Sequence, residues 1–247
     1  MNKIIILLSL ITCQICDAQT TEPIQADRPD QTETPAIVPK GMFQVETGFT
    51  FQKNDEFSKT NTLPTVLWKY GVNENFELRL ITEFTSEKIF DEKQDGFLPV
   101  YVGFKVKLSE EKGIIPKTSF IAHIGLPSAA STKYKNEFYA PEFRFVMQHT
   151  LNKKMSLSYN LGAEWDGFSA EPSFLYTLTT GYSITEKFGS YIELFGFAPQ
   201  KDKVNHNFDA GFTYLINNNF MLDLSLGIGL TKNAPDHYLA IGFSFRI

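Results

Sequence analysis

The strand pattern that decides the fold is clearest near the C-terminus, in the run Phe220-Met221-Leu222-Asp223-Leu224-Ser225-Leu226-Gly227-Ile228-Gly229-Leu230. Apolar residues occupy every even position of this run. From Asp223 to Gly229, polar residues or glycines occupy every odd position. A period of two places successive side chains on opposite faces of a β-strand. The run therefore predicts a strand with one apolar face and one face of small or polar side chains.

The same alternation returns along the chain from Gly41 onward. Strong examples cover residues 42–52, 76–84, 100–108, 139–149, 155–162, 174–184, 208–216 and 239–247, and weaker ones cover residues 63–70, 118–126 and 188–197. Together they predict about twelve strands of roughly nine to eleven residues, the length that crosses a bilayer when a strand is tilted. Strands of soluble proteins are shorter, with about five or six residues.

The connections between these segments alternate in length. Short ones cover residues 72–75, 151–154, 185–187 and 217–219, and longer ones cover residues 53–62, 86–95 and 127–136. Short periplasmic turns and longer outer loops produce this rhythm in membrane barrels. Tyrosine and tryptophan also lie near strand ends on the apolar face, as an interfacial girdle requires, at Trp68, Tyr70, Tyr139, Tyr182 and Tyr214. A soluble sandwich alternates too, but lacks these features. We therefore predict an all-β chain that forms a transmembrane antiparallel up-and-down β-barrel of about twelve strands in the cell outer membrane of a Gram-negative bacterium.

The first eighteen residues have the pattern of a signal peptide. Lys3 precedes a short apolar run, and small residues precede a predicted cleavage site after Ala18. The run is too short for a membrane-spanning anchor. Lipidation at Cys13 is an alternative, which Thr12 at the preceding position disfavours. Residues 1–18 are thus predicted to be a signal peptide, residues 19–41 a polar, proline-rich periplasmic segment, and residues 42–247 the barrel.

Both cysteines of the chain, Cys13 and Cys16, lie in this leader. The predicted mature chain has no cysteine, which excludes disulfides, thiolate metal sites and a cysteine nucleophile. The formal net charge of −5 argues against a nucleic-acid partner, because no basic field exists to neutralise phosphates.

The alternation places charged residues of both signs on the faces of the strands that point into the predicted lumen. They are Glu46, Lys69, Glu77, Arg79, Glu83, Lys105, Lys107, Glu142, Arg144, Glu164, Glu193, Asp209, Asp223 and Arg246. Such a mixture predicts no strongly ion-selective ring. Glycines lie mostly on the same face, which leaves space, and about twelve strands lie between the filled eight-stranded barrel and the open sixteen-stranded one. Two interpretations remain open: a narrow conduit, or a network of paired charges that fills the barrel. We expect Tyr191, Phe195 and Phe197 to face inward, where their rings either favour an aromatic solute or close the lumen.

Motifs for catalysis are missing from the sequence. We find no His-x-x-x-His, no Gly-x-Ser-x-Gly and no glycine-rich phosphate loop, and so predict no catalytic residues, no metal ligands and no cofactor. His206 and His237 fall on the lipid-facing side near an outer loop, but no well-placed serine accompanies either. A lipid-modifying enzyme is therefore only a third hypothesis.

The segment before the first strand carries a motif of its own, Ala26-Asp27-Arg28-Pro29-Asp30-Gln31-Thr32-Glu33-Thr34-Pro35. This motif resembles the opening signature of an outer-membrane family labelled the meta-pathway of phenol degradation, often described as transporters. Residues 63–71 with 76–79 resemble its second hairpin, and residues 234–236 with 242–246 resemble its end. The resemblance implies a barrel that takes up or expels small molecules, and it brings no agreed catalytic residues.

These observations predict an outer-membrane channel or transporter in which small solutes, hydrophobic or aromatic ones included, pass passively through the lumen. A closed structural or interaction barrel is the alternative. Asp27, Arg28, Asp30 and Glu33 are predicted to form a periplasmic plug that pairs with inward Lys69, Arg79, Lys105, Lys107 or Arg246, and a solvated tail is the alternative for this segment. The expected partners are outer-membrane lipid, a small-molecule solute and, through the aromatic-rich residues 243–247, the barrel insertion machinery.

Overall fold

The computed structural model describes residues 22–247, so the predicted signal peptide lies outside the described residues. Its strands are β1 (Phe43–Lys53), β2 (Ser58–Asn73), β3 (Phe76–Ile89), β4 (Glu92–Phe97), β5 (Val100–Ser109), β6 (Lys117–Leu126), β7 (Ala140–Asn152), β8 (Met155–Glu164), β9 (Ser173–Ser183), β10 (Phe188–Pro199), β11 (Asn205–Asn217), β12 (Phe220–Gly229) and β13 (His237–Arg246). A single 3₁₀ turn, η1 (Thr132–Tyr134), is the only helical element between residues 22 and 247. No helix in this described part of the chain is long and apolar enough to cross a membrane.

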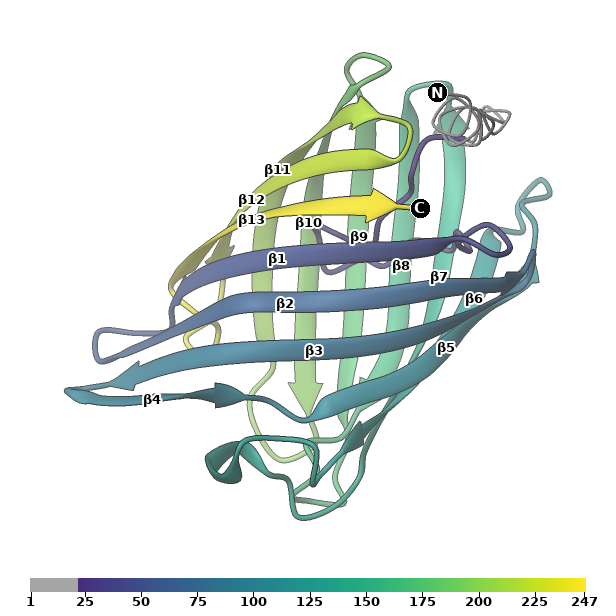
Figure 1. Ribbon diagram of the computed structural model, residues 1–247. Coiled ribbons are helices and arrows are strands. Elements are labelled where there is room, and N and C mark those ends of the chain that lie inside the picture. The colour runs from purple at the N-terminus through teal and green to yellow at the C-terminus, as the bar shows by residue number, and fades with distance from the viewer. Residues whose placement is uncertain (1–21) are drawn as a thin grey trace, which may run out of the picture.

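The sheet closes on itself, because the first strand pairs with the last (Figure 1). Ten residue pairs join β1 to β13, from Gln44 opposite Arg246 to Lys53 opposite His237. Every pairing in the sheet is antiparallel, and neighbouring strands of the wall are also neighbours in sequence apart from the short β4. Closure leaves no open sheet edge around the wall, as the hydrocarbon of a bilayer requires. The predicted all-β antiparallel barrel is confirmed.

Two of the predicted long loops are wrong. Residues 58–62 belong to β2 and residues 86–89 to β3, and these strands continue as a hairpin with Ser58 opposite Ile89. The short β4 then pairs with the end of β3, so the wall has twelve strands and the hairpin adds a thirteenth. The extension meets water on both faces, so its side chains need no strict apolar alternation. For that reason the sequence pattern did not reveal it.

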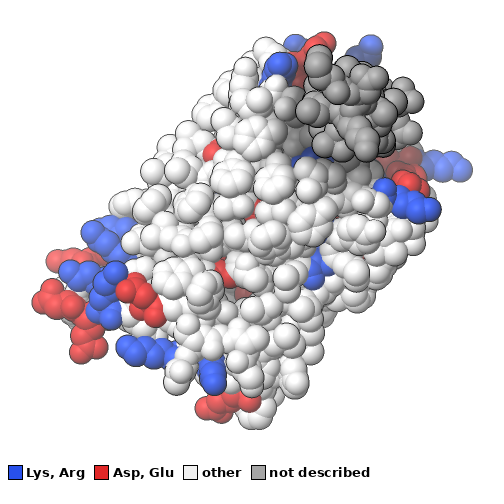
Figure 2. All heavy atoms as spheres, in the orientation of Figure 1, with Lys and Arg blue, Asp and Glu red and all other residues white. Residues whose placement is uncertain are grey.

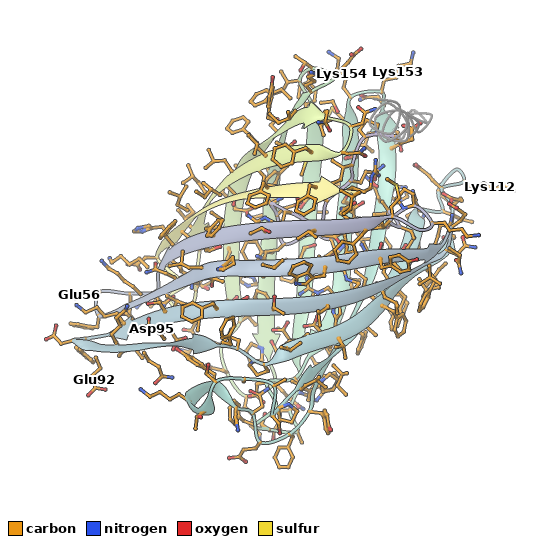
Figure 3. The ribbon with its side chains drawn as sticks, viewed as in Figure 1. Glu56, Glu92, Asp95, Lys112, Lys153 and Lys154 are labelled. Atoms are coloured by element: carbon orange, nitrogen blue, oxygen red, sulfur yellow. The ribbon has the colours of Figure 1, made fainter. Side chains whose placement is uncertain are left out.

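The outer surface of the wall is apolar and its ends are charged. Leu222, Leu226 and Ile228 of β12 are 40, 59 and 51% exposed, whereas the intervening Asp223 and Ser225 are buried. Figure 2 shows lysine, arginine, aspartate and glutamate gathered mainly at the two ends of the molecule, with a broad band of other residues between them. Figure 3 shows Glu56, Glu92 and Asp95 at one end and Lys112, Lys153 and Lys154 at the other. An apolar band between polar ends matches a bilayer.

The two ends of the barrel can be told apart. The longest connections, residues 127–139 and 165–172, lie at one end of the barrel. β1 begins and β13 ends at the opposite end, where two-residue turns join β7 to β8 and β11 to β12. Short turns are periplasmic in membrane barrels, so this is the periplasmic end, and the β2–β3–β4 hairpin extends from the outer end.

Candidate functional site in the lumen

The segment before β1, residues 22–41, enters the lumen from the periplasmic end and returns to it (Figure 1). At its start, the backbone N–H of Ile24 donates to the carbonyl of Asn218 in the β11–β12 turn, at 2.8 Å. Deeper in the lumen, the N–H of Val38 donates to the Glu77 carboxylate, also at 2.8 Å. At its exit, the N–H of Gly41 donates to the carbonyl of Gly71. We call residues 22–41 the lumenal segment.

Asp27 is the most strongly paired residue of the lumenal segment. Its buried carboxylate lies 2.9 Å from the Lys69 Nζ, the Arg79 Nη1 and the Lys105 Nζ, which come from β2, β3 and β5. Burial alone would raise the pKa of Asp27, but these cations hold that pKa well below its ordinary value. The remaining negative charge around the cations comes from Glu46, Glu77 and Glu33. We call Asp27, Glu46, Lys69, Glu77, Arg79 and Lys105 the Asp27 cluster.

Arg79 connects the Asp27 cluster to the next strands. Its Nη2 donates to Glu33 of the lumenal segment at 2.7 Å, and its Nε donates to the Nε2 of His123 at 3.0 Å. The other ring nitrogen of His123 lies 2.6 Å from the Glu142 carboxylate. Ser119 of β6 donates to the carbonyl of Pro35 at 2.7 Å. The strands from β1 to β7 therefore hold the segment mainly through buried charges.

The strands from β8 to β13 hold the lumenal segment with neutral groups and fewer charges. The Thr32 hydroxyl lies 2.6 Å from the hydroxyls of both Thr177 and Thr179 on β9. The N–H of Gln31 donates to Glu193 at 2.8 Å. In addition, the N–H of Glu33 donates to the amide oxygen of Asn160 at 2.7 Å. Thr32, Asn160, Thr177 and Thr179 were not predicted from the sequence as site residues. The only signal for Asn160, Thr177 and Thr179 was a polar side chain on the inward face of a strand, and the only signal for Thr32 was its place in the motif of residues 26–35.

Arg28 occupies a slot on this second side. Its guanidinium donates to Asp223 at 2.9 Å and lies against Gly48 and Gly242. A Cβ atom would lie 1.9 Å from Nη1 of Arg28 if added to Gly48, and 2.6 Å from Nε if added to Gly242. Gly48 is opposite Gly242, which in turn is opposite Asp223, so three adjacent strands build the slot. The space that these glycines leave is filled by an arginine of the segment.

Other predicted lumen residues lie apart from the Asp27 cluster. Glu83 accepts a hydrogen bond from Thr65 at 2.8 Å, and Lys107 pairs with Glu110 at the periplasmic end instead of with the segment. Arg144 donates to the carbonyl of Gln31, and Arg246 donates to that of Glu22. The carboxylates form opposed pairs across neighbouring strands, Glu142 with Glu164 and Glu193 with Asp209. Asp209 accepts hydrogen bonds from the hydroxyls of Tyr191 and Tyr238.

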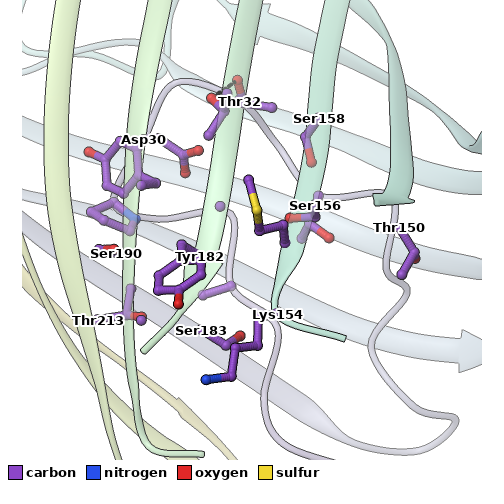
Figure 4. A pocket seen from close by; sticks show the side chains of 18 of the residues that line it. Asp30, Thr32, Thr150, Lys154, Ser156, Ser158, Tyr182, Ser183, Ser190 and Thr213 are labelled. Atoms are coloured by element: carbon purple, nitrogen blue, oxygen red, sulfur yellow. Dashed lines mark hydrogen bonds between the residues drawn. The ribbon is translucent and has the colours of Figure 1, made fainter. Parts of the chain in front are cut away.

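Two cavities of about 350 Å³ each lie beside the lumenal segment. The inner cavity, near the periplasmic end, is rich in hydroxyl groups, with Ser156, Ser158, Ser190 and Thr213 in its wall. Figure 4 shows these residues around Asp30 and Thr32 of the segment. The outer cavity is lined by Phe195, Phe197, Asn205, Asn207 and Tyr238, among others. Within residues 22–247, no group of three His, Cys, Asp or Glu side chains is arranged to hold a metal ion.

A closed wall with an apolar exterior and a polar, partly filled lumen defines an outer-membrane β-barrel. The sequence model of the family described as "Putative MetA-pathway of phenol degradation" matches residues 26–247, and the chain therefore belongs to this family. No curated protein is similar enough in sequence to be recognised as a relative.

Solved structures share the fold at low sequence identity. An outer-membrane channel from Pseudomonas putida F1 superposes with a TM-score of 0.72 at 13% identity, covering 90% of this chain and 100% of that one. The NanC porin gives a TM-score of 0.57 at 9% identity, covering 83% of this chain and 100% of its own. The CymD monoaromatic hydrocarbon channel gives 0.50 at 8% identity, covering 85% and 88%.

Proposed function

We propose that this protein is an outer-membrane channel through which small solutes pass passively, and that the lumenal segment is a plug that narrows it. The observation that carries the proposal is the pair of cavities, one toward each end of the lumen, beside a segment that is held there by side-chain contacts, with backbone hydrogen bonds to the wall at its two ends and no strand pairing. A segment held in this way can move without breaking the ladder of the wall.

The walls of the outer cavity favour a solute with an apolar or aromatic body. Phe195 and Phe197 meet edge to face with their ring centroids 6.2 Å apart, and Tyr238 lines the same space. The amides of Asn205 and Asn207 supply hydrogen-bonding groups beside these rings. The fold shared with a channel named for monoaromatic hydrocarbons supports the same solute class. We propose small aromatic molecules with one or two polar groups.

Planar-bilayer recording tests the channel. We expect reproducible conductance steps from the intact protein and larger ones after deletion of residues 20–35, because the strands alone supply the closed ladder. The deletion variant must retain the heat-resistant migration of a folded barrel. Silent bilayers from both folded proteins would support the closed structural barrel instead.

We propose that the protein is not an enzyme. His206, one of the two lipid-side histidines, lies 2.6 Å from the Tyr176 hydroxyl through its Nδ1, which suits a structural role at the interface. Incubation of the folded protein with phospholipid vesicles should release no fatty acid. Release that disappears in a His206→Ala variant would support a lipid-modifying enzyme.

We also propose that β13 carries the signal for the insertion machinery. Phe243 and Phe245 lie on one face of this terminal strand, which pairs with β1 to close the barrel. Replacing both with serine should lower the amount of folded barrel in cells more than it lowers unassisted refolding in vitro. Equal losses in both settings would mean that the two rings only contribute to stability.

A further inference from the structure

The two cavities meet the same three residues of the lumenal segment. Arg28, Pro29 and Asp30 line the inner cavity on one side and the outer cavity on the other. The inner cavity continues to Lys153 and Lys154 at the periplasmic end, whereas the outer cavity reaches Pro235 and Asn205 toward the outer end. These three residues, which we call the tip, therefore separate the two spaces.

The Arg28 slot lies directly at the inward edge of the outer cavity. Thr50 and Ala240 face each other across β1 and β13 and line that cavity. Gly48 and Gly242 are the next inward-facing pair on the same two strands. Since neither glycine has a side chain, the groove continues past the cavity edge until the Arg28 guanidinium fills it. Removing the guanidinium leaves bare backbone in its place.

The tip is held less firmly than its neighbour Asp27. Asp27 contacts three buried cations, and its side chain is 4% exposed. Arg28 has one carboxylate partner, Asp223, and its side chain is 18% exposed. Partly exposed ion pairs contribute less than buried clusters, because water competes for both partners. Arg28 can thus leave its slot while Asp27 keeps the segment in place.

We propose that Arg28 is the gate residue of the channel. With the guanidinium in the slot of Gly48, Gly242 and Asp223, the tip closes the connection between the cavities. When the guanidinium leaves the slot, the cavities join into one passage along the β8–β13 side of the lumen. This inference rests on the proposed channel function and assigns its regulation to a single side chain.

The gate also sets the charge preference of the passage. Asp30 lines both cavities, and Glu193, Asp209 and Asp223 project inward on the neighbouring strands, with Arg28 as the cation at the tip. Once Arg28 leaves, Asp223 has no ion-pair partner left within residues 22–247. The open passage therefore favours cationic and uncharged solutes over anions.

Replacing Arg28 tests the gate in the full-length protein. We expect Arg28→Ala to raise single-channel conductance in planar bilayers and to shift the reversal potential in a KCl gradient toward cation selectivity. Gly48→Ala keeps the charge of Arg28 but places a Cβ atom in the slot, so it should raise conductance in the same direction. Lys88→Ala, which removes a cation from the exposed hairpin pair with Asp91, is the matched control and should change neither quantity.

Thiol accessibility supplies a measurement that does not depend on current. Residues 22–247 contain no cysteine, so Ser156→Cys places a single thiol in the inner cavity of this part of the chain. A membrane-impermeant cationic methanethiosulfonate is added at the outer face of vesicles whose barrel orientation is established by protease cleavage of the β3–β4 hairpin. We expect slow labelling with Arg28 present and faster labelling in the Arg28→Ala background.

The outcomes separate the gate from the channel itself. If the deletion of residues 20–35 raises conductance but Arg28→Ala and Gly48→Ala do not, the channel stands and the gate is refuted. If no variant conducts, the proposed channel function fails. Equal labelling rates with and without Arg28 refute the gate whether or not current is observed.

Discussion

The two sides of the lumen hold the same segment by different means. From β1 to β7, two buried lysines and one buried arginine converge on Asp27 and Glu33, with charged atoms 2.7–2.9 Å apart. From β8 to β13, threonine hydroxyls, an asparagine amide, the Glu193 carboxylate and the partly exposed pair of Arg28 and Asp223 hold the segment, and both cavities border on this side. The β1–β7 side therefore anchors the segment, and the β8–β13 side leaves room for a solute.

The largest effect is expected at the anchor. Asp27→Ala leaves Lys69, Arg79 and Lys105 without their shared partner, and breaking a buried ion cluster in this way costs about 3–5 kcal/mol. Equilibrium unfolding in urea from lipid vesicles measures this loss. Asp27→Asn, which keeps the shape and some hydrogen bonds, is the control and should lose less. If Asp27→Ala is as stable as the intact protein, the anchoring side is no firmer than the other.

The next largest loss of stability is expected on the lipid-facing surface of the β8–β13 side. Leu224→Arg places a charge on the lipid-facing surface and should cost roughly 2–4 kcal/mol if it lies at the membrane midplane, whereas Ser225→Arg, inside the barrel, should cost less. Refolding into vesicles gives both free energies. Equal penalties would mean that Leu224 and Ser225 do not face lipid and lumen, respectively.

A smaller effect is expected where the second side holds the segment. Thr32→Val removes a hydroxyl that contacts Thr177, Thr179 and the Glu193 carboxylate, and leaving buried hydrogen-bonding partners unsatisfied costs about 1–3 kcal/mol. The same urea unfolding measures it, with Thr150→Val at the rim of the inner cavity as the control. A loss as large as that of Asp27→Ala would erase the difference between the two sides.

The smallest effect is expected from moderate acid. Because the folded pKa of Asp27 is depressed, its stabilising contribution is fully present above the unfolded pKa of about 3.9 and is lost only as the pH falls through the lower folded value. The difference in free energy of unfolding between the intact protein and Asp27→Asn should therefore stay constant from neutral pH down to about pH 5, well above that unfolded pKa. A fall in this difference within the window would show that the anchor titrates where we expect it not to.

Some of the site could be predicted from the sequence and some could not. The inward faces of β2, β3 and β5 follow from alternation, which is why Lys69, Arg79 and Lys105 could be named as partners for the charged motif before the first strand. The sequence could not show that Asp27 pairs with all three cations, or that Arg28 pairs with Asp223. Each of those contacts joins residues 42–195 positions apart, and one-dimensional alternation carries no information about which lumen residues meet. The extended hairpin was missed because strands surrounded by water need not alternate.

The sequence by itself determined that this chain builds a wall with one face for lipid and one for water, because a period of two and the bilayer thickness leave a closed barrel as the stable arrangement. It also predicted which charges face inward. Only the tertiary structure decided that the segment before β1 occupies part of the lumen, that Gly48 and Gly242 form a slot for Arg28, and that the inner and outer cavities lie mainly beside β8 to β13. The physical reason is that strand pairing is local and repetitive, whereas packing inside the lumen depends on the diameter and shear that closure imposes on all strands together.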